Sequence, residues 1–143
     1  MSIVRQKRKI STWMLVACGL WLAALGLYFI FLRPALLPED TRFMGMPLAE
    51  IQMHAPGLEI WLKKVFSVMG GFMVSAGVLT VFVGTVAMPR ELKGTAWVVA
   101  LSGLFSVGLM AATNFGIHSD FRWTLLAPAV AWLLAFAFYM ARR

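Results

Sequence analysis

The sequence predicts an all-α membrane protein, with four transmembrane helices in an antiparallel bundle and an amphipathic loop helix on the outer side. Hydrophobic residues make up 61% of the chain and the mean hydropathy is +0.81, whereas soluble domains are roughly 45–50% apolar. These residues are gathered in long blocks, and the charged residues, 13% of the chain, lie between the blocks. Long apolar blocks of this kind indicate membrane spans.

Four blocks contain neither a charged residue nor a histidine: residues 10–32, 65–89, 94–117 and 123–141. Each has about the 20 residues that a helix needs to cross the apolar core of a bilayer. Because four spans and one longer loop occupy the chain, we expect a single domain over residues 1–143. Its predicted spans are residues 12–32, 65–88, 95–116 and 123–141, and its predicted outer loop is residues 33–64.

The first block follows a basic stretch, Arg5 to Lys9, that is typical of the start of a signal peptide. Its apolar run is longer than the roughly 7–15 residues of a signal peptide. No Ala-x-Ala cleavage site ends it, and Arg33 and Pro34 follow directly. We therefore expect a retained helix that anchors the chain.

The loop at 33–64 begins with Pro34 and Pro38, so its first part is expected to be non-helical, with a turn at residues 39–41. Residues 47–54 predict a short helix because proline is favoured in the first turn of a helix. After a break at residues 56–57, apolar residues recur at helical spacing into the second span. Such a segment is expected to lie on the outer membrane surface as an amphipathic cap.

Lysines and arginines are unevenly divided between the two sides of this bundle. Eight lie in the two terminal segments and the loop between the second and third spans, and five lie on the other side. Because cytoplasmic loops carry an excess of these residues, we expect both termini in the cytoplasm and the chain in the inner (plasma) membrane of a bacterium. Since the cations flank the spans, topology explains the net charge of +7 without nucleic acid as a partner.

Glycines are spaced regularly within the first two spans. Small residues on one helix face allow two backbones to approach closely, which is what association in lipid requires. These faces predict helix packing within the bundle, and they also offer a surface to a second copy or to a larger membrane complex. The residues concerned are Gly70, Gly77 and Gly84, which recur every seven positions, together with Gly19 and Gly26.

Polar residues gather in both connections on the outer side. The segment GIHSDFRW, residues 116–123, places a histidine, an acid and an arginine within five residues, and the longer loop carries further charges. One interpretation is structural: Asp40 or Asp120 pairs with Arg33, Arg42 or Arg122, because charges near a partly desolvated interface need partners. The other is a site for a lipid headgroup, a quinone or a small molecule. The candidate residues are Asp40, Arg42, Asn114, His118, Asp120 and Arg122.

Several kinds of chemistry are disfavoured by the sequence. Cys18 is the single cysteine, which excludes a dithiol redox pair. No charged residue lies in the middle of a predicted span, whereas proton-coupled transporters usually place one there. Thioethers can bind Cu(I), but the spacing of the residues concerned is too loose to indicate a site: they are Met44, Met46, Met53 and His54. A haem bound within the bundle would need histidines in the spans, and both histidines lie outside them. We therefore expect neither a metal nor a cofactor.

Three segments together resemble a family of small bacterial four-helix inner-membrane proteins of uncharacterised function. They are LPEDTRFMG at 37–45, GGFMVSAGVLT at 70–80 and NFGIHSDFRW at 114–123. The resemblance covers the chain from about Trp13 and implies a multi-pass bacterial inner-membrane protein. It implies no activity and no site residues.

No catalytic motif is evident, so the sequence favours a non-enzymatic accessory or interaction subunit that packs through its glycine and alanine faces. It does not exclude an enzyme. The alternative is the binding site at the outer face described above, either as a site that only binds or as one that also catalyses a reaction. A small transporter is the third hypothesis.

Overall fold

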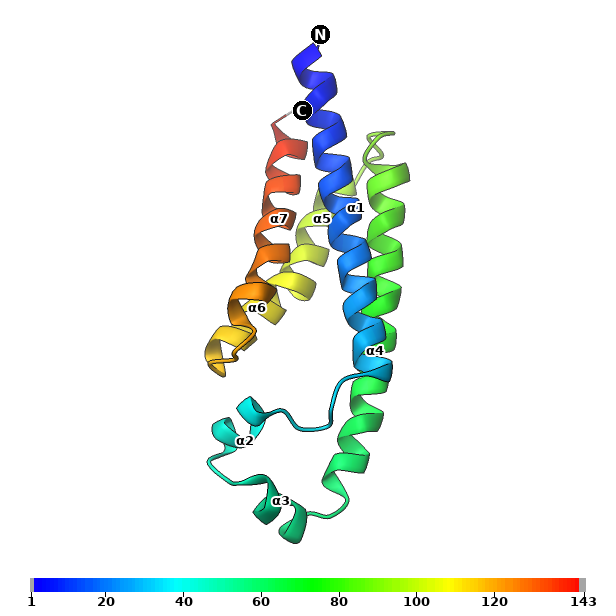
Figure 1. Ribbon diagram of the computed structural model, residues 1–143. Coiled ribbons are helices and arrows are strands. Elements are labelled where there is room, and N and C mark those ends of the chain that lie inside the picture. Colours follow the sequence, from blue (N-terminus) through cyan, green and yellow to red (C-terminus); the bar gives the residue numbers. More distant parts are fainter. Residues whose placement is uncertain (1, 142–143) are drawn as a thin grey trace.

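A computed structural model describes the backbone of residues 2–141 and the side chains from Lys9 onward (Figure 1), and it is helical over these residues apart from turns and short connections. Its elements are α1 (Ser2–Phe31), α2 (Pro38–Met44), α3 (Leu48–His54), α4 (Leu58–Phe82), the π-helical η1 (Val83–Ala87), α5 (Thr95–Gly103), the π-helical η2 (Leu104–Gly108), α6 (Leu109–Gly116) and α7 (Arg122–Met140).

Four helices are long and apolar enough to cross a membrane, as the sequence predicts: Lys9–Phe31, Leu58–Ala87, Thr95–Gly116 and Arg122–Met140. The chain is therefore described as a multi-pass membrane protein. The helix of the second span begins at Leu58, earlier than the predicted start of that span at 65. Glu59, Lys63 and Lys64 interrupt the apolar run without interrupting the helix, so the connection between α1 and α4 is shorter than the predicted loop of 33–64.

Helix α2 replaces the turn that was expected at residues 39–41. Pro38 stands in its first turn, where the missing N–H is no loss. The Asp40 carboxylate accepts a hydrogen bond from the Leu37 backbone N–H at 2.8 Å, which satisfies one otherwise unpaired donor at the helix start. Gly45, with φ of 67°, ends the helix in the left-handed conformation. The predicted short helix after Pro47 is present as α3.

Helices α1 and α4 are in backbone contact through their glycines. Gly19 lies against Gly77 and Gly26 lies against Gly70, so the two helices run in opposite directions. A Cβ atom added to Gly70 would be 2.6 Å from the carbonyl oxygen of Gly26, closer than any Cβ tolerates. The glycine faces predicted from the sequence therefore meet each other within the chain.

The buried core lies between α1, α7 and the continuous helix formed by α5, η2 and α6. Trp132 of α7 donates a hydrogen bond from its indole Nε1 to the carbonyl oxygen of Val99 at 2.8 Å. Gly103 gives the indole room, because a Cβ there would overlap the Trp132 ring. The core residues are Leu15, Cys18, Met88, Val99, Val107, Ala111, Ala129, Trp132, Ala135 and Tyr139.

Helix α1 is central to this arrangement, because it packs against α4 on one face and α7 on another. The two ends of the described chain lie together at one end of the molecule, and α2 and α3 lie at the opposite end (Figure 1). Helix α4 packs mainly against α1, and the rest of its surface is largely exposed within the described chain.

We predict that Gly70→Ala destabilises the protein by about 1–3 kcal/mol, because the added methyl overpacks the contact with α1. The matched control is Gly71→Ala, since a Cβ at Gly71 meets nothing within 4 Å. Thermal unfolding of both variants in the same detergent measures the difference. Equal midpoints for the two variants would show that the glycine contact does not limit stability.

Candidate functional site

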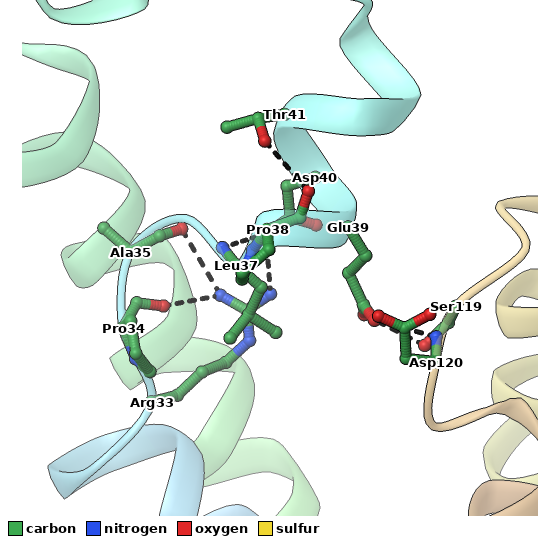
Figure 2. Close-up of polar contacts among 10 residues, drawn as sticks. All are labelled: Arg33, Pro34, Ala35, Leu37, Pro38, Glu39, Asp40, Thr41, Ser119 and Asp120. Atoms are coloured by element: carbon green, nitrogen blue, oxygen red, sulfur yellow. Dashed lines mark hydrogen bonds and ion pairs between the residues drawn. The ribbon is translucent and has the colours of Figure 1, made fainter. Parts of the chain in front are cut away.

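The candidate site is built on residues 33–42, here termed the strap, which connect the α1–α4 pair with the turn between α6 and α7. The strap begins just after α1 and includes five of the seven residues of α2, from Pro38 to Arg42. Figure 2 shows its side chains reaching in two directions, with Arg33 and Asp40 turned toward each other and Glu39 turned toward Ser119 and Asp120.

Arg33 anchors the strap to α1 and α4. Its guanidinium lies 3.7 Å from the ring centroid of Phe66 and 5.3 Å from that of Phe29, in a cation–π arrangement. It donates a hydrogen bond to the Pro34 carbonyl at 2.8 Å and pairs with the Asp40 carboxylate at 3.4 Å. Only 10% of its side chain is exposed, so the charge is enclosed by partners that compensate for lost water.

Glu39 joins the strap to the turn between α6 and α7, and it is the buried carboxylate of the site. Its side chain accepts hydrogen bonds from the Ser119 hydroxyl and from the Asp120 backbone N–H, both at 2.9 Å. Ser119 is fully buried and accepts a further hydrogen bond from the Phe121 N–H at 3.1 Å. Because α7 begins at Arg122, the Glu39 carboxylate also lies near the positive end of that helix.

Arg42 forms the second link to this turn. Its guanidinium donates to the Asp120 carboxylate at 2.9 Å, and the two side chains are 59% and 62% exposed. Exposed ion pairs contribute about 0–1 kcal/mol. The buried Glu39 contacts therefore hold the strap more firmly than this pair does.

The end of α6 explains His118 and Asn114. The Ser119 N–H bonds to the Asn114 carbonyl at 2.9 Å, and the His118 N–H bonds to the Phe115 carbonyl at 3.1 Å. This is the Schellman pattern, in which the residue after the cap adopts the left-handed conformation. His118 occupies that position with φ of 54°. The Asn114 side chain donates to the Met110 carbonyl of its own helix at 2.9 Å.

The six predicted site residues thus divide into separate groups. Asp40 pairs with Arg33, and Arg42 pairs with Asp120. Both ion pairs are among the combinations that the structural interpretation of the sequence allowed. Asn114 and His118 shape the end of α6, and Arg122 begins α7 half-buried. The contacts described above join them in separate pairs, and the side chains described here include no group of three or more His, Cys, Asp or Glu residues that could hold a metal ion.

Two residues of this site were missed as site candidates: Glu39 and Ser119. Their contact joins positions 80 residues apart, which one sequence cannot reveal. One local signal was available for Ser119: a serine in a turn often accepts a hydrogen bond from the backbone N–H two residues later. In the structure the Phe121 N–H donates to the Ser119 hydroxyl in this way. Chemically, the arrangement is a set of mutually satisfied donors and acceptors that attaches the strap to both halves of the molecule.

We predict that Glu39→Gln destabilises this junction by about 1–3 kcal/mol, because the amide replaces a charged acceptor and directs an N–H at one of its two donors. Hydrogen exchange of the Asp120 amide is expected to accelerate roughly ten- to hundredfold, following the same free energy. Glu50→Gln on exposed α3 is the matched control. Unchanged exchange at Asp120 in Glu39→Gln would contradict the role of this carboxylate.

We predict that His118→Gly raises the free energy of unfolding by about 0.5–1 kcal/mol, since glycine adopts the left-handed conformation without the penalty of a Cβ. Ile117→Gly is the control, because Ile117 has φ of −87° and gains nothing from glycine. Denaturant or thermal unfolding measures both. A loss of stability in His118→Gly would instead reveal a stabilising contact of the imidazole.

Comparison of the chain with protein-family models, with curated proteins and with solved structures finds no match. The resemblance to small bacterial four-helix membrane proteins therefore stays a prediction from sequence. The fold and the contacts of the strap are the basis on which a function is proposed.

Proposed function

We propose that the chain is an integral protein of a bacterial inner (plasma) membrane that serves as a non-enzymatic accessory or interaction subunit. In this proposal its four spans form an antiparallel bundle, its termini are cytoplasmic, and α2 and α3 form an amphipathic layer on the outer side. The excess of lysine and arginine near the termini supports this orientation. So does the position of both chain ends opposite α2 and α3 (Figure 1).

One observation carries the proposal: an exposed apolar stripe on α4 between Trp61 and Phe72. Trp61, Val65, Val68 and Phe72 are spaced by four, three and four residues, and all are exposed. This is the alternation with which one helix packs against another at a shallow angle. We define these four residues as the α4 stripe.

The opposite face of α4 is already occupied within the chain. Gly70 and Gly77 are buried against α1, so the glycine face is not free to receive a partner as the sequence alone suggested. A partner helix in this proposal therefore binds the α4 stripe, where the two smaller valines between Trp61 and Phe72 leave room for close packing and α1 does not interfere.

The rival hypothesis, a binding or catalytic site at the outer face, is less well supported. The Glu39 and Asp40 carboxylates accept hydrogen bonds from the strap and from the turn after α6, and Asp120 pairs with Arg42. Glu39 and Asp40 are thus engaged in holding the strap in place, which leaves their carboxylates poorly placed to bind a substrate. No observation on the described residues favours the transporter hypothesis.

The test is site-specific photo-crosslinking in native membranes with benzoylphenylalanine in place of Phe72. We expect a cross-link to a transmembrane polypeptide, either a second copy of this chain or a different subunit, which mass spectrometry identifies. Leu133 of α7 is the control position, because it is comparably exposed and lies outside the α4 stripe.

The stoichiometry of the cross-linked product distinguishes an oligomer from a larger complex. Cross-linking of Phe72 to lipid alone, at the level seen for Leu133, would overturn the proposal of an interaction subunit.

A further inference from the structure

A groove of about 410 Å³ separates the second half of α4 from α5 and η2. Leu79 and Val83 line one wall, Val98 and Ser102 line the other, and Leu15 and Trp132 lie at the back. Both walls pass into π-helical turns, η1 on one side and η2 on the other. Such turns occur frequently at functional sites, because they displace the backbone from regular helical packing.

The lining of the groove suits an apolar ligand that needs no hydrogen bonds. The Thr80 hydroxyl donates to the Ala76 carbonyl at 2.8 Å, and the Ser106 hydroxyl donates to the Ser102 carbonyl, each within its own helix. Two other side-chain donors line the groove: the Trp132 indole N–H is bonded to the Val99 carbonyl, and the Ser102 hydroxyl is a single small polar group among mostly apolar side chains. An occupant would therefore be held by dispersion and shape.

The volume of the groove suits a small apolar ligand. At about 410 Å³ it lies in the range of roughly 300–1,000 Å³ that is usual for small-ligand sites. A single flexible hydrocarbon chain fits such a slot.

Cations lie in the connection that follows one end of the groove, between lining residues Val83 and Val98. The connection between η1 and α5 joins its two walls directly and carries Arg90 and Lys93, both exposed. Gly84 of η1 packs against Thr12 and Val16 of α1, so exposed Lys9 lies about one turn beyond this contact, toward the same connection. Glu91 is the one acidic residue among them. A net positive rim beside an apolar slot complements a ligand with an anionic head and an apolar tail.

We propose that this groove binds one acyl chain of an anionic phospholipid, whose phosphate is bound by Arg90 and Lys93. The inference goes beyond the proposed function and is independent of it. It uses the second half of α4, from Ala76 onward, whereas the α4 stripe ends at Phe72.

Native mass spectrometry of the full chain, extracted from nanodiscs that contain phosphatidylglycerol and phosphatidylcholine, tests the proposal. We expect about one retained phosphatidylglycerol per chain and little phosphatidylcholine, as for other basic headgroup sites. Ser102→Trp fills the groove and is expected to lower retention about tenfold or more, because the slot for the chain is lost. Leu101→Trp is the control, since the neighbouring Leu101 is exposed and outside the groove lining.

The charge is tested separately. Replacing Arg90 and Lys93 together by alanine is expected to lower phosphatidylglycerol retention about ten- to thirtyfold, as expected for the loss of two cations at a headgroup. The matched control replaces the exposed pair Lys63 and Lys64 at the other end of α4, and it should leave retention unchanged. Equal retention of phosphatidylcholine, or no effect of the Arg90 and Lys93 substitutions, would overturn the anionic headgroup site.

If Ser102→Trp fails to fold, the wild-type protein still provides a test. Phosphatidylglycerol with a photoactivatable acyl chain is expected to label the peptides that contain Leu79 or Ser102. Labels spread evenly over the four apolar helices, or a co-purified polypeptide cross-linked from the groove, would overturn the proposal.

Discussion

The backbone contact between α1 and α4 is the constraint on which the rest of the structure depends. In lipid, apolar side chains gain little by leaving their surroundings, so association relies on close packing and small residues. Gly19, Gly26, Gly70 and Gly77 bring the two backbones together along the helices. This contact fixes α4 on one side of α1 and leaves α7 to pack on another side. Because α4 is held by α1, it need not pack against α5, and the groove between them follows from that separation.

The strap connects the α1–α4 pair with the α5–α7 helices at the end of the molecule where α2 and α3 lie. The α1–α4 pair and the α5–α7 helices share a core where Leu15, Val99 and Trp132 are buried. Beyond that core, the two parts are connected by polar contacts of residues 33–42. Arg33 is held by the rings of one part, and Glu39 by the turn of the other. A buried carboxylate is tolerated here because its two oxygens accept a hydroxyl and a backbone N–H.

The sequence predicted what depends on local pattern and failed on what depends on distant contacts. The four apolar helices follow from composition over windows of about 20 residues. The glycines that recur every seven residues in α4 and η1 indicated a close helix contact but did not identify α1 as the partner. Helix α2 was missed because Pro34 and Pro38 indicated irregular structure, although Pro38 begins the helix. Arg42 and Asp120 were foreseen as possible ion-pair partners, but nothing in the sequence could select them over other pairs. Glu39 and Ser119 lie 80 positions apart in the chain, and a single sequence does not indicate which distant residues come into contact.

The segment GIHSDFRW shows that a polar stretch can interrupt so apolar a chain for structural reasons. His118 is the left-handed residue that ends α6, Ser119 and the Asp120 N–H receive Glu39, and Arg122 begins α7. These four residues therefore each have a structural role, and the turn that they form binds the strap through Glu39. The groove lies nearer the other end of the molecule, where η1, η2 and the cations of the connecting loop meet. The strap contacts α1 and α4 at Phe29 and Phe66, whereas the groove contacts these helices at Leu15 and Leu79. Because the two regions share no contact residue, changes in the strap and changes in the groove are expected to act independently.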